Sequence, residues 1–477
     1  MYSSLARTLR PLLIVGLATL SSCAHHTESA NTTGAAGNGV SGPACNTGTT
    51  PFCDAHEAVP SGWTGHRFRL LQDYADAAAA PDAEPWKKYD FATQPREYIF
   101  ALLTYAYGGN YGTDWDSPNT ASKRRHWFHA PALDYGDNGR EAISGLTRER
   151  TSTQYELGYA QIHCWDNWAV GLYNDPGGYT LGKVWNNRDN PDASAAKFPE
   201  GTMAVKLLFT SAPVTEVPWL DGSPEWDADI YEGDTVPSDS RCASAPAPSP
   251  ARSPQKVRLL QVDVAVKDSR ANPLTGWVFG TFVFQANQPQ PELVAFGARG
   301  GWRELAPVGL MWGNDPGLSD GEVPQQTWLN PQVRMMHVGY QGRLDGPIDN
   351  KISSCLSCHG TAEVPIDAMI PPSATPGRPP PDVSPWFQNV PSGVPFEKGH
   401  ISTDYSLQIA FGIKNFEKYH PSSPSSASRG SVGTAPRAHL GTLETTSRPF
   451  SPRDPPYVKP SDPINLSSFH TKPPSRP

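Results

Sequence analysis

Apolar residues change their spacing along the chain, from a helical period near the beginning to short runs of strand type in the middle. Helical spacing predicts helices over 66–82 and 93–106, the second with Pro95 in its first turn and Thr93 as its cap. Between about 125 and 285, β-branched and aromatic runs separated by Gly, Asn and Pro predict strands. These runs cover 168–173, 203–209, 259–266 and 277–284.

The last third of the chain is richer in loop-forming residues. Residues 286–354 combine aromatic side chains with turn signals, and a proline-rich stretch follows at 371–396. An amphipathic segment from Tyr405 to Phe416 predicts one more helix, capped by Thr403 or Asp404. The expected fold is α+β, with a β-rich antiparallel core and a few helices.

Composition narrows the class of protein. The 477 residues carry a formal net charge of −8, and this acidic balance argues against a nucleic-acid binder, which needs a basic surface. The 14 tryptophans, 17 tyrosines and 17 phenylalanines favour aromatic-rich, strand-rich packing. Fifty prolines, about twice the usual share of about 5%, indicate long irregular segments, including an Ala/Pro/Ser loop at 243–254.

The N-terminus has the pattern of an export signal. Arg7 and Arg10 precede an apolar run from Leu12 to Leu20 that is too short to be a permanent membrane span. The run ends in Leu-Ser-Ser-Cys, which resembles the bacterial lipobox, and the resemblance implies lipidation of Cys23. Since Ala24 rather than Asp follows, it also implies the bacterial outer membrane, facing the periplasm or the cell surface. The alternative is an ordinary signal peptide with an unrelated cysteine.

Cys355, Cys358 and His359 form the spacing of c-type haem attachment, in Ser-Cys-Leu-Ser-Cys-His-Gly. Two thiols three residues apart can bond the two vinyl groups on one edge of a porphyrin, and the adjacent histidine can then ligate the iron. We therefore expect one covalent haem c, with His359 as the proximal ligand. A zinc site or a thioredoxin-like thiol pair is the alternative for the same residues.

Four further cysteines are available for disulfides in an exported protein. The preferred pairing joins Cys45 to Cys53 and Cys164 to Cys242, and the alternative leaves some of them as free thiols.

Three segments upstream of the haem motif carry a family resemblance. They are Phe198–Lys206, which contains Gly-Thr-Met-Ala-Val-Lys, then Val264–Arg270, and then Gly276–Phe279. Together with the haem motif they resemble the cytochromes of P-460 type and their sister family, the β-type relatives of cytochrome c-prime, over about 198–360. The resemblance implies a β-rich haem domain with an open iron site, which oxidises hydroxylamine in the first family and binds nitric oxide in the second. It also implies a cross-link from Lys206 to the porphyrin.

The sequence departs from this family between Phe284 and Cys355, where 70 residues replace a short connection. The phenylalanine- and carboxylate-bearing segment that follows the motif in the family is also not evident. From the residues alone, Lys206 is a charge in an apolar strand, on the same face as Ala204 and Leu208. Its ammonium must therefore either reach a sheet edge or point at the haem.

The sixth iron ligand separates an electron carrier from a catalyst, because a methionine blocks the iron and an open site admits small molecules. Met369 is the distal candidate downstream of the motif, and an open site is the equal alternative. Other residues that could reach the iron are Met335, Met336, His337 and His400.

These patterns divide the chain into a signal peptide (1–22), a lipid-anchored flexible tether (23–60), an aromatic-rich region (61–190), a haem domain (191–420) and a disordered tail (421–477). The favoured function is electron transfer with a redox partner protein. A haem-dependent oxidoreductase acting on a small nitrogen or peroxide species is the alternative, and a ligand-sensing module with a structural haem is a third. Whether the protein is an enzyme is left open, and its catalytic residues are not identified.

Overall fold

The computed structural model describes most of the central part of the chain. The described residues are 59–65, 70–77, 83–108, 110, 115, 126–131, 140–231, 252–332, 338–372 and 381–419. They all fall within one of the two units of the chain, Ser41–Pro477. The predicted signal peptide, nearly all of the tether and the whole tail lie outside the described residues.

Ten strands and five α-helices make up the described part. The helices are α1 (Pro95–Tyr107), α2 (Asp175–Val184), α3 (Pro291–Phe296), α4 (Cys355–His359) and α5 (Leu407–Tyr419). The strands are β1 (Thr147–Ser152), β2 (Trp165–Tyr173), β3 (Met203–Thr210), β4 (Glu225–Tyr231), β5 (Arg252–Lys267), β6 (Trp277–Phe284), β7 (Leu305–Met311), β8 (Thr327–Leu329), β9 (Glu363–Val364) and β10 (Ile401–Ser402).

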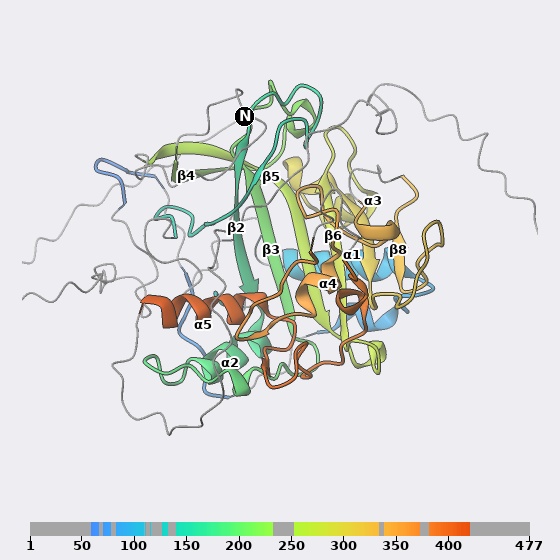
Figure 1. Cartoon of the computed structure of the whole chain (residues 1–477). Helices are drawn as coiled ribbons and strands as arrows, with labels where there is room; N and C mark the ends of the chain where they lie inside the picture. The colour runs from blue at the N-terminus through green and yellow to red at the C-terminus, as the bar shows by residue number, and fades with distance from the viewer. Residues whose placement is uncertain are drawn as a thin grey trace, which may run out of the picture. The chain divides into compact units, whose positions relative to one another are not determined.

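Eight of these strands form one antiparallel sheet in the order β1-β2-β3-β5-β6-β7-β8, with β4 paired to the first half of β5. Figure 1 shows β2, β3, β5 and β6 side by side, with α4 and α5 in front of them and α1 behind. The predicted α+β, β-rich antiparallel fold is confirmed. The sequence predicted a boundary between an aromatic-rich region and a haem domain at residue 190. The sheet crosses this position, because β1 and β2 precede it and the other strands of the sheet follow it.

Each face of the sheet has its own hydrophobic core. Ile99 of α1 packs so closely on β6 that a β-carbon at Gly280 would collide with it. On the opposite face, a β-carbon at Gly171 of β2 would collide with Gln408 of α5. A larger residue at either position would have to displace the end of the Ile99 or the Gln408 side chain, so both glycines let a helix lie close to the sheet. The face under α4 and α5 is the one that carries the candidate site.

The helix predicted at 66–82 is wrong, because the described part of it, 70–77, is not helical. Leu71 instead pairs with His129 in both directions: Leu71 N–H donates to His129 Nδ1, and the Leu71 carbonyl accepts from the His129 N–H, each at 2.9 Å. These long-range hydrogen bonds outweigh a weak local helix propensity.

Helix boundaries also differ from the prediction in detail. α1 forms as expected, but Gln94 rather than Thr93 precedes its first turn. α5 begins at Leu407, after Tyr405, and the hydroxyl of Ser406 accepts from the backbone N–H of Ile409 at 3.1 Å. Thr403 and Asp404 therefore do not cap α5. Loop residues 252–254, expected to be irregular, are the start of β5.

β7 was not predicted, although it lies inside the sheet and is buried along its whole length. Pro307 and Gly309 interrupt its apolar run, and the register with β6 shifts between Thr281 and Phe282, opposite Pro307. Proline and glycine inside a strand are signals against a strand assignment, and they are tolerated here at a bulge. The 70 residues between Phe284 and Cys355 therefore add two strands, β7 and β8, to the sheet.

Candidate functional site

Helix α4 carries the Cys-x-x-Cys-His motif and begins at a reciprocal cap. The hydroxyl of Ser354 accepts from the Ser357 N–H at 3.1 Å, while the Ser357 hydroxyl accepts from the Ser354 N–H at 2.8 Å. Leu356 is fully buried, whereas Cys355, Cys358 and His359 are only partly buried. Positions i, i+3 and i+4 share one face of a helix, so both thiols and the imidazole project to the same, more open side of α4.

The ring of His359 is held in one orientation. Its Nδ1 lies 2.9 Å from the carbonyl oxygen of Tyr405, and because a carbonyl can only accept, Nδ1 carries the hydrogen. Phe279 packs on the ring with centroids 4.7 Å apart. Burial lowers the pKa of His359 to about 4. At neutral pH the Nε2 lone pair is thus available to a metal, in the arrangement usual for metal-bound histidine.

The carbonyl of Tyr405 is presented by an unusual stretch of backbone. Asp404 and Tyr405 both have positive φ angles, 50° and 69°, a region that costs about 1–2 kcal/mol for a residue with a side chain. The buried carboxylate of Asp404 offsets this by accepting hydrogen bonds, at 2.7–3.1 Å, from Lys267 Nζ, Trp277 Nε1, Ser392 Oγ and Phe198 N. Strained backbone that the surroundings hold in place is typical of functional sites.

A small hollow of about 30 Å³, partly open to solvent, lies beside His359. Ala204 and Ala265, on neighbouring strands, contribute small side chains to it, and aromatic side chains supply most of the remaining wall. The lining residues are Tyr173, Phe198, Ala204, Ala265, Trp277, Phe279, His359, Tyr405 and Ser406. Ligand pockets usually measure about 300–1,000 Å³, so this hollow has room for about one water molecule. A haem attached to Cys355 and Cys358 would therefore lie mostly outside the hollow.

Behind Cys355 the sheet presents carboxylates. The Cys355 thiol lies 3.9 Å from the hydroxyl of Thr281, which donates to Asp263 at 2.8 Å. Burial, together with the charges of Asp345 and Asp349, raises the pKa of Cys355 well above its usual value, and burial raises that of Cys358 to about 12. Both thiols are therefore protonated at neutral pH. This disfavours the thioredoxin-like alternative, which needs a thiolate.

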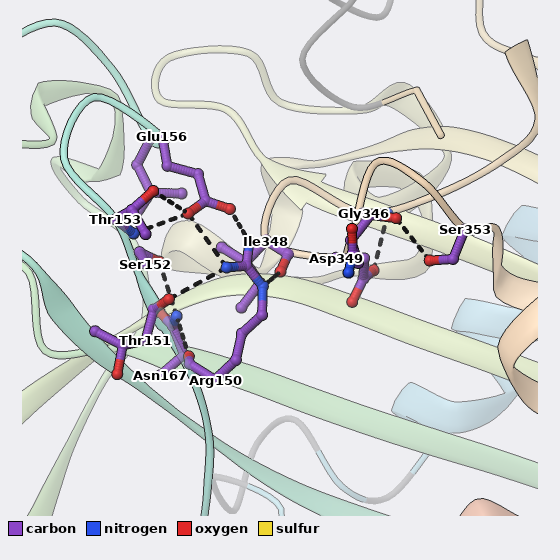
Figure 2. A network of polar contacts seen from close by, with 12 residues as sticks. Arg150, Thr151, Ser152, Thr153, Glu156, Asn167, Gly346, Ile348, Asp349 and Ser353 are labelled. Atoms are coloured by element: carbon purple, nitrogen blue, oxygen red, sulfur yellow. Dashed lines mark hydrogen bonds and ion pairs between the residues drawn. The ribbon is translucent and has the colours of Figure 1, made fainter. Parts of the chain in front are cut away.

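The loop that carries Asp345 and Asp349 is tied to the sheet edge (Figure 2). Arg150 of β1 donates to the carbonyl of Ile348 and pairs with Glu156, while the carboxylate of Asp349 accepts from the Gly346 N–H at 2.8 Å. Burial lowers the pKa of Arg150. Asp345 is 4% exposed, and its Oδ2 has no hydrogen-bond partner. Burial and the neighbouring Asp349 raise the pKa of Asp345.

Lys206 lies in the middle of β3, opposite Asp263 of β5 in the strand register. Its ammonium pairs with Glu149 of the edge strand β1 at 3.3 Å. Although burial opposes it, the charges of Glu149, Asp349 and Asp263 raise the pKa of Lys206 overall, and its charge in turn contributes to the lowered pKa of His359. The ammonium of Lys206 thus reaches toward the sheet edge. Across the neighbouring strands Lys206 lies opposite Asp263 and Asp263 lies opposite Thr281, whose hydroxyl is next to Cys355, so these side chains form one row across the sheet.

The other predicted site residues are spread through the chain. Met369 is half-buried and is not among the residues that line the hollow. His400 pairs with Glu363 at 3.0 Å. Cys164 is disulfide-bonded, while its proposed partner Cys242 lies outside the described residues, as do Cys23, Cys45, Cys53, Met335, Met336 and His337.

Comparisons with known proteins identify no relative. No family model, no curated protein and no solved structure matches the chain. Among the described residues, none of the helices is long and apolar enough to span a membrane.

The sequence did not point to Asp404, Lys267 or Trp277, which position the Tyr405 carbonyl. The sequence did contain a hint that two of these residues matter. Lys267 and Trp277 lie within Val264–Arg270 and Gly276–Phe279, two of the segments that carry the family resemblance.

Proposed function

We propose that the protein is an exported, lipid-anchored c-type cytochrome that binds one haem and acts in electron transfer. The observation that carries this proposal is the hydrogen bond from His359 Nδ1 to the Tyr405 carbonyl, on the same open face of α4 as both thiols. This bond orients Nε2 for an axial iron ligand. The raised thiol pKa values add support because they disfavour the thioredoxin-like alternative for the motif.

In this function Cys355 and Cys358 would hold the haem by thioether bonds, and His359 would ligate the iron. The bound haem supplies reversible one-electron exchange. Phe279 and the Tyr405 carbonyl keep the imidazole in place. Lipidation of Cys23 would anchor the protein at the outer membrane, where a redox partner protein would exchange electrons with it.

A second candidate is a haem oxidoreductase with an open iron site, as in the resembling families, acting on a small nitrogen species such as hydroxylamine or nitric oxide, or on a peroxide. One observation favours it. The positively charged Lys206 lies beside Asp263 in the row of side chains next to Cys355. A cation and a carboxylate near an open iron could bind a polar ligand and move its protons.

Haem staining on a denaturing gel tests the attachment. The double variant Cys355→Ala, Cys358→Ala should lose all staining, because thioether bonds survive denaturation and coordinated haem does not. Cys23→Ser is the matched control, since it removes a cysteine outside the motif and should stain normally. Staining that persists in the double variant would refute the haem assignment.

Carbon monoxide then separates the two candidate functions. A haem with methionine as its sixth ligand should keep the spectrum of its reduced form when the gas is added, as expected for an electron carrier. A shifted spectrum would show an open site and favour the oxidoreductase.

A further inference from the structure

A turn before β10 brings two potential metal ligands together. The His400 N–H donates to the Glu397 carbonyl at 3.2 Å, and Gly399 has a φ of 94°. Glycine at the third position is required by this kind of tight turn. The turn places the side chains of its first and last residues side by side, with His400 Nε2 3.8 Å from Glu397 Oε2.

A third ligand comes from β9, which pairs with β10 in a two-stranded antiparallel sheet. Glu363 Oε1 lies 3.0 Å from His400 Nδ1, and Glu363 Oε2 accepts from the Glu397 N–H at 2.9 Å. The pairing of β9 with β10 holds this arrangement, because Val364 lies opposite Ile401, the residue that follows His400. Glu363 is 3% exposed, and a carboxylate so deeply buried is stabilised by hydrogen bonds and by any positive charge placed next to it.

We propose that Glu363, Glu397 and His400 bind a divalent transition-metal ion, for which Zn²⁺ is the probe. One ligand atom from each residue lies within 4.8 Å of the others. Zinc bonds of about 2.0–2.1 Å in a tetrahedron put ligand atoms about 3.3 Å apart. Glu363 lies next to Nδ1 of His400 and Glu397 next to Nε2, so the imidazole has to turn before one of its nitrogens and both carboxylates close on a single ion.

The chemistry of the ligands selects the metal. One imidazole nitrogen and two carboxylates suit Zn²⁺ and its first-row neighbours, whereas Ca²⁺ and Mg²⁺ prefer oxygen ligands alone. Two carboxylates and a neutral imidazole carry a charge of −2, which a divalent ion neutralises. Three protein ligands leave a fourth position for water or another small ligand. The Glu397 side chain is 45% exposed, so this position can be reached from solvent.

The position of this metal site gives it a structural consequence. β10 (Ile401–Ser402) directly follows His400 and leads into Asp404 and Tyr405, whose carbonyl orients His359. An ion at the site would tie the turn to β9 and so brace the segment that positions the Tyr405 carbonyl. The proposal does not depend on the haem, because none of its three ligands belongs to the Cys-x-x-Cys-His motif.

Equilibrium dialysis of the purified full-length protein against Zn²⁺, with zinc and iron measured separately, tests the proposal. We expect one zinc per chain in the wild type. Glu397→Gln and His400→Gln should each weaken zinc binding by at least about 10-fold, the lower end of the loss usually seen when even an indirect metal contact is removed.

Two controls separate this site from other zinc binders in the chain. His163→Gln removes a similar pair, in which His163 Nδ1 lies 2.6 Å from Glu216 Oε1 but which belongs to no three-ligand group among the described residues. Cys358→Ser removes a thiol of the haem motif. Both variants should bind zinc as the wild type does.

Glu397→Gln is the deciding variant, because its exposed side chain makes it the change least able to disturb folding. The proposal is wrong if wild-type protein takes up no zinc, if Glu397→Gln binds it with unchanged affinity, or if Cys358→Ser abolishes the binding. Tight Ca²⁺ binding that persists in His400→Gln would indicate an oxygen-only site and also overturn the assignment.

Discussion

The imidazole of His359 donates from Nδ1 to the backbone carbonyl of Tyr405, 46 residues later in the chain, over 2.9 Å. This hydrogen bond joins the short helix α4 to the segment before α5 and decides which ring nitrogen remains available. The segment that supplies the carbonyl has two successive residues with positive φ. It is held by the buried Asp404 carboxylate, which therefore acts as a positioning residue for His359.

Replacing Asp404 by Asn should destabilise the protein by about 3 kcal/mol. Asparagine tolerates positive φ, so the change mainly removes a buried charge that pairs with Lys267 at 2.7 Å. Breaking such a pair leaves the partner charge uncompensated, at a cost of about 3–5 kcal/mol when both groups are fully buried. Urea unfolding measures the effect.

Asp382→Asn is the control for Asp404→Asn, because Asp382 is exposed and its hydrogen bond within the described part of the chain goes to the nearby Ser384. Its free energy of unfolding should stay within about 0.5 kcal/mol of the wild type. Equal stabilities for the two variants would show that the Asp404 network does not hold the segment.

Asp345 should make the protein less stable as the pH rises. Burial raises the folded-state pKa of Asp345 above its unfolded value of about 3.9. The folded state therefore binds more protons than the unfolded state between these two values, so stability is highest below the unfolded pKa and falls as the pH rises through the folded one.

Asp345→Asn keeps the shape of the protonated acid and removes this titration. We expect the variant to be more stable than the wild type at pH 8 by about 1–3 kcal/mol, the cost of one buried polar atom without a partner, here Oδ2 among the described residues, with a smaller gain at pH 5. Urea unfolding at several pH values measures it, with the exposed Asp367→Asn as control. A constant difference between the Asp345→Asn and wild-type curves would contradict the prediction.

Lys206 should remain a free lysine, because its ammonium already pairs with Glu149. The haem peptide released by trypsin should then contain the Cys355–His359 segment without Lys206, and the Soret band should lie where an ordinary haem c has it. Mass spectrometry of the haem peptide gives the answer. A peptide in which Lys206 is bonded to haem would instead favour the open-site oxidoreductase.

Membrane attachment should depend on Cys23. A single acyl chain binds a membrane weakly, whereas the several chains of a mature lipoprotein anchor it firmly. The Cys23→Ser protein should move from the membrane fraction to the soluble periplasmic fraction, as fractionation and immunoblotting would show. Wild-type protein in the soluble fraction would rule out the lipid anchor.

The sequence by itself determined the elements whose signals are local. α1 follows from apolar residues at helical spacing behind Pro95, and β6 from the apolar and aromatic run Trp277–Phe284, which is broken only by Gly280 and Thr281. The Cys355–His359 motif is also local, because its chemistry depends on a spacing of a few residues. Where a proline and a glycine broke the local pattern, as in β7, the sequence alone failed.

Only the tertiary structure decided which distant residues contact the Cys355–His359 motif and its supporting segment. Asp404 bonds to the Phe198 N–H across 206 residues, His359 to Tyr405 across 46, and Glu363 to His400 across 37. Hydrophobic periodicity reports which face of an element is buried, but it does not specify which distant side chain meets that face. These long-range contacts depend on the order of the strands and on the path of the loops. They orient the ring of His359, raise the pKa of the two thiols and place His400 next to Glu363.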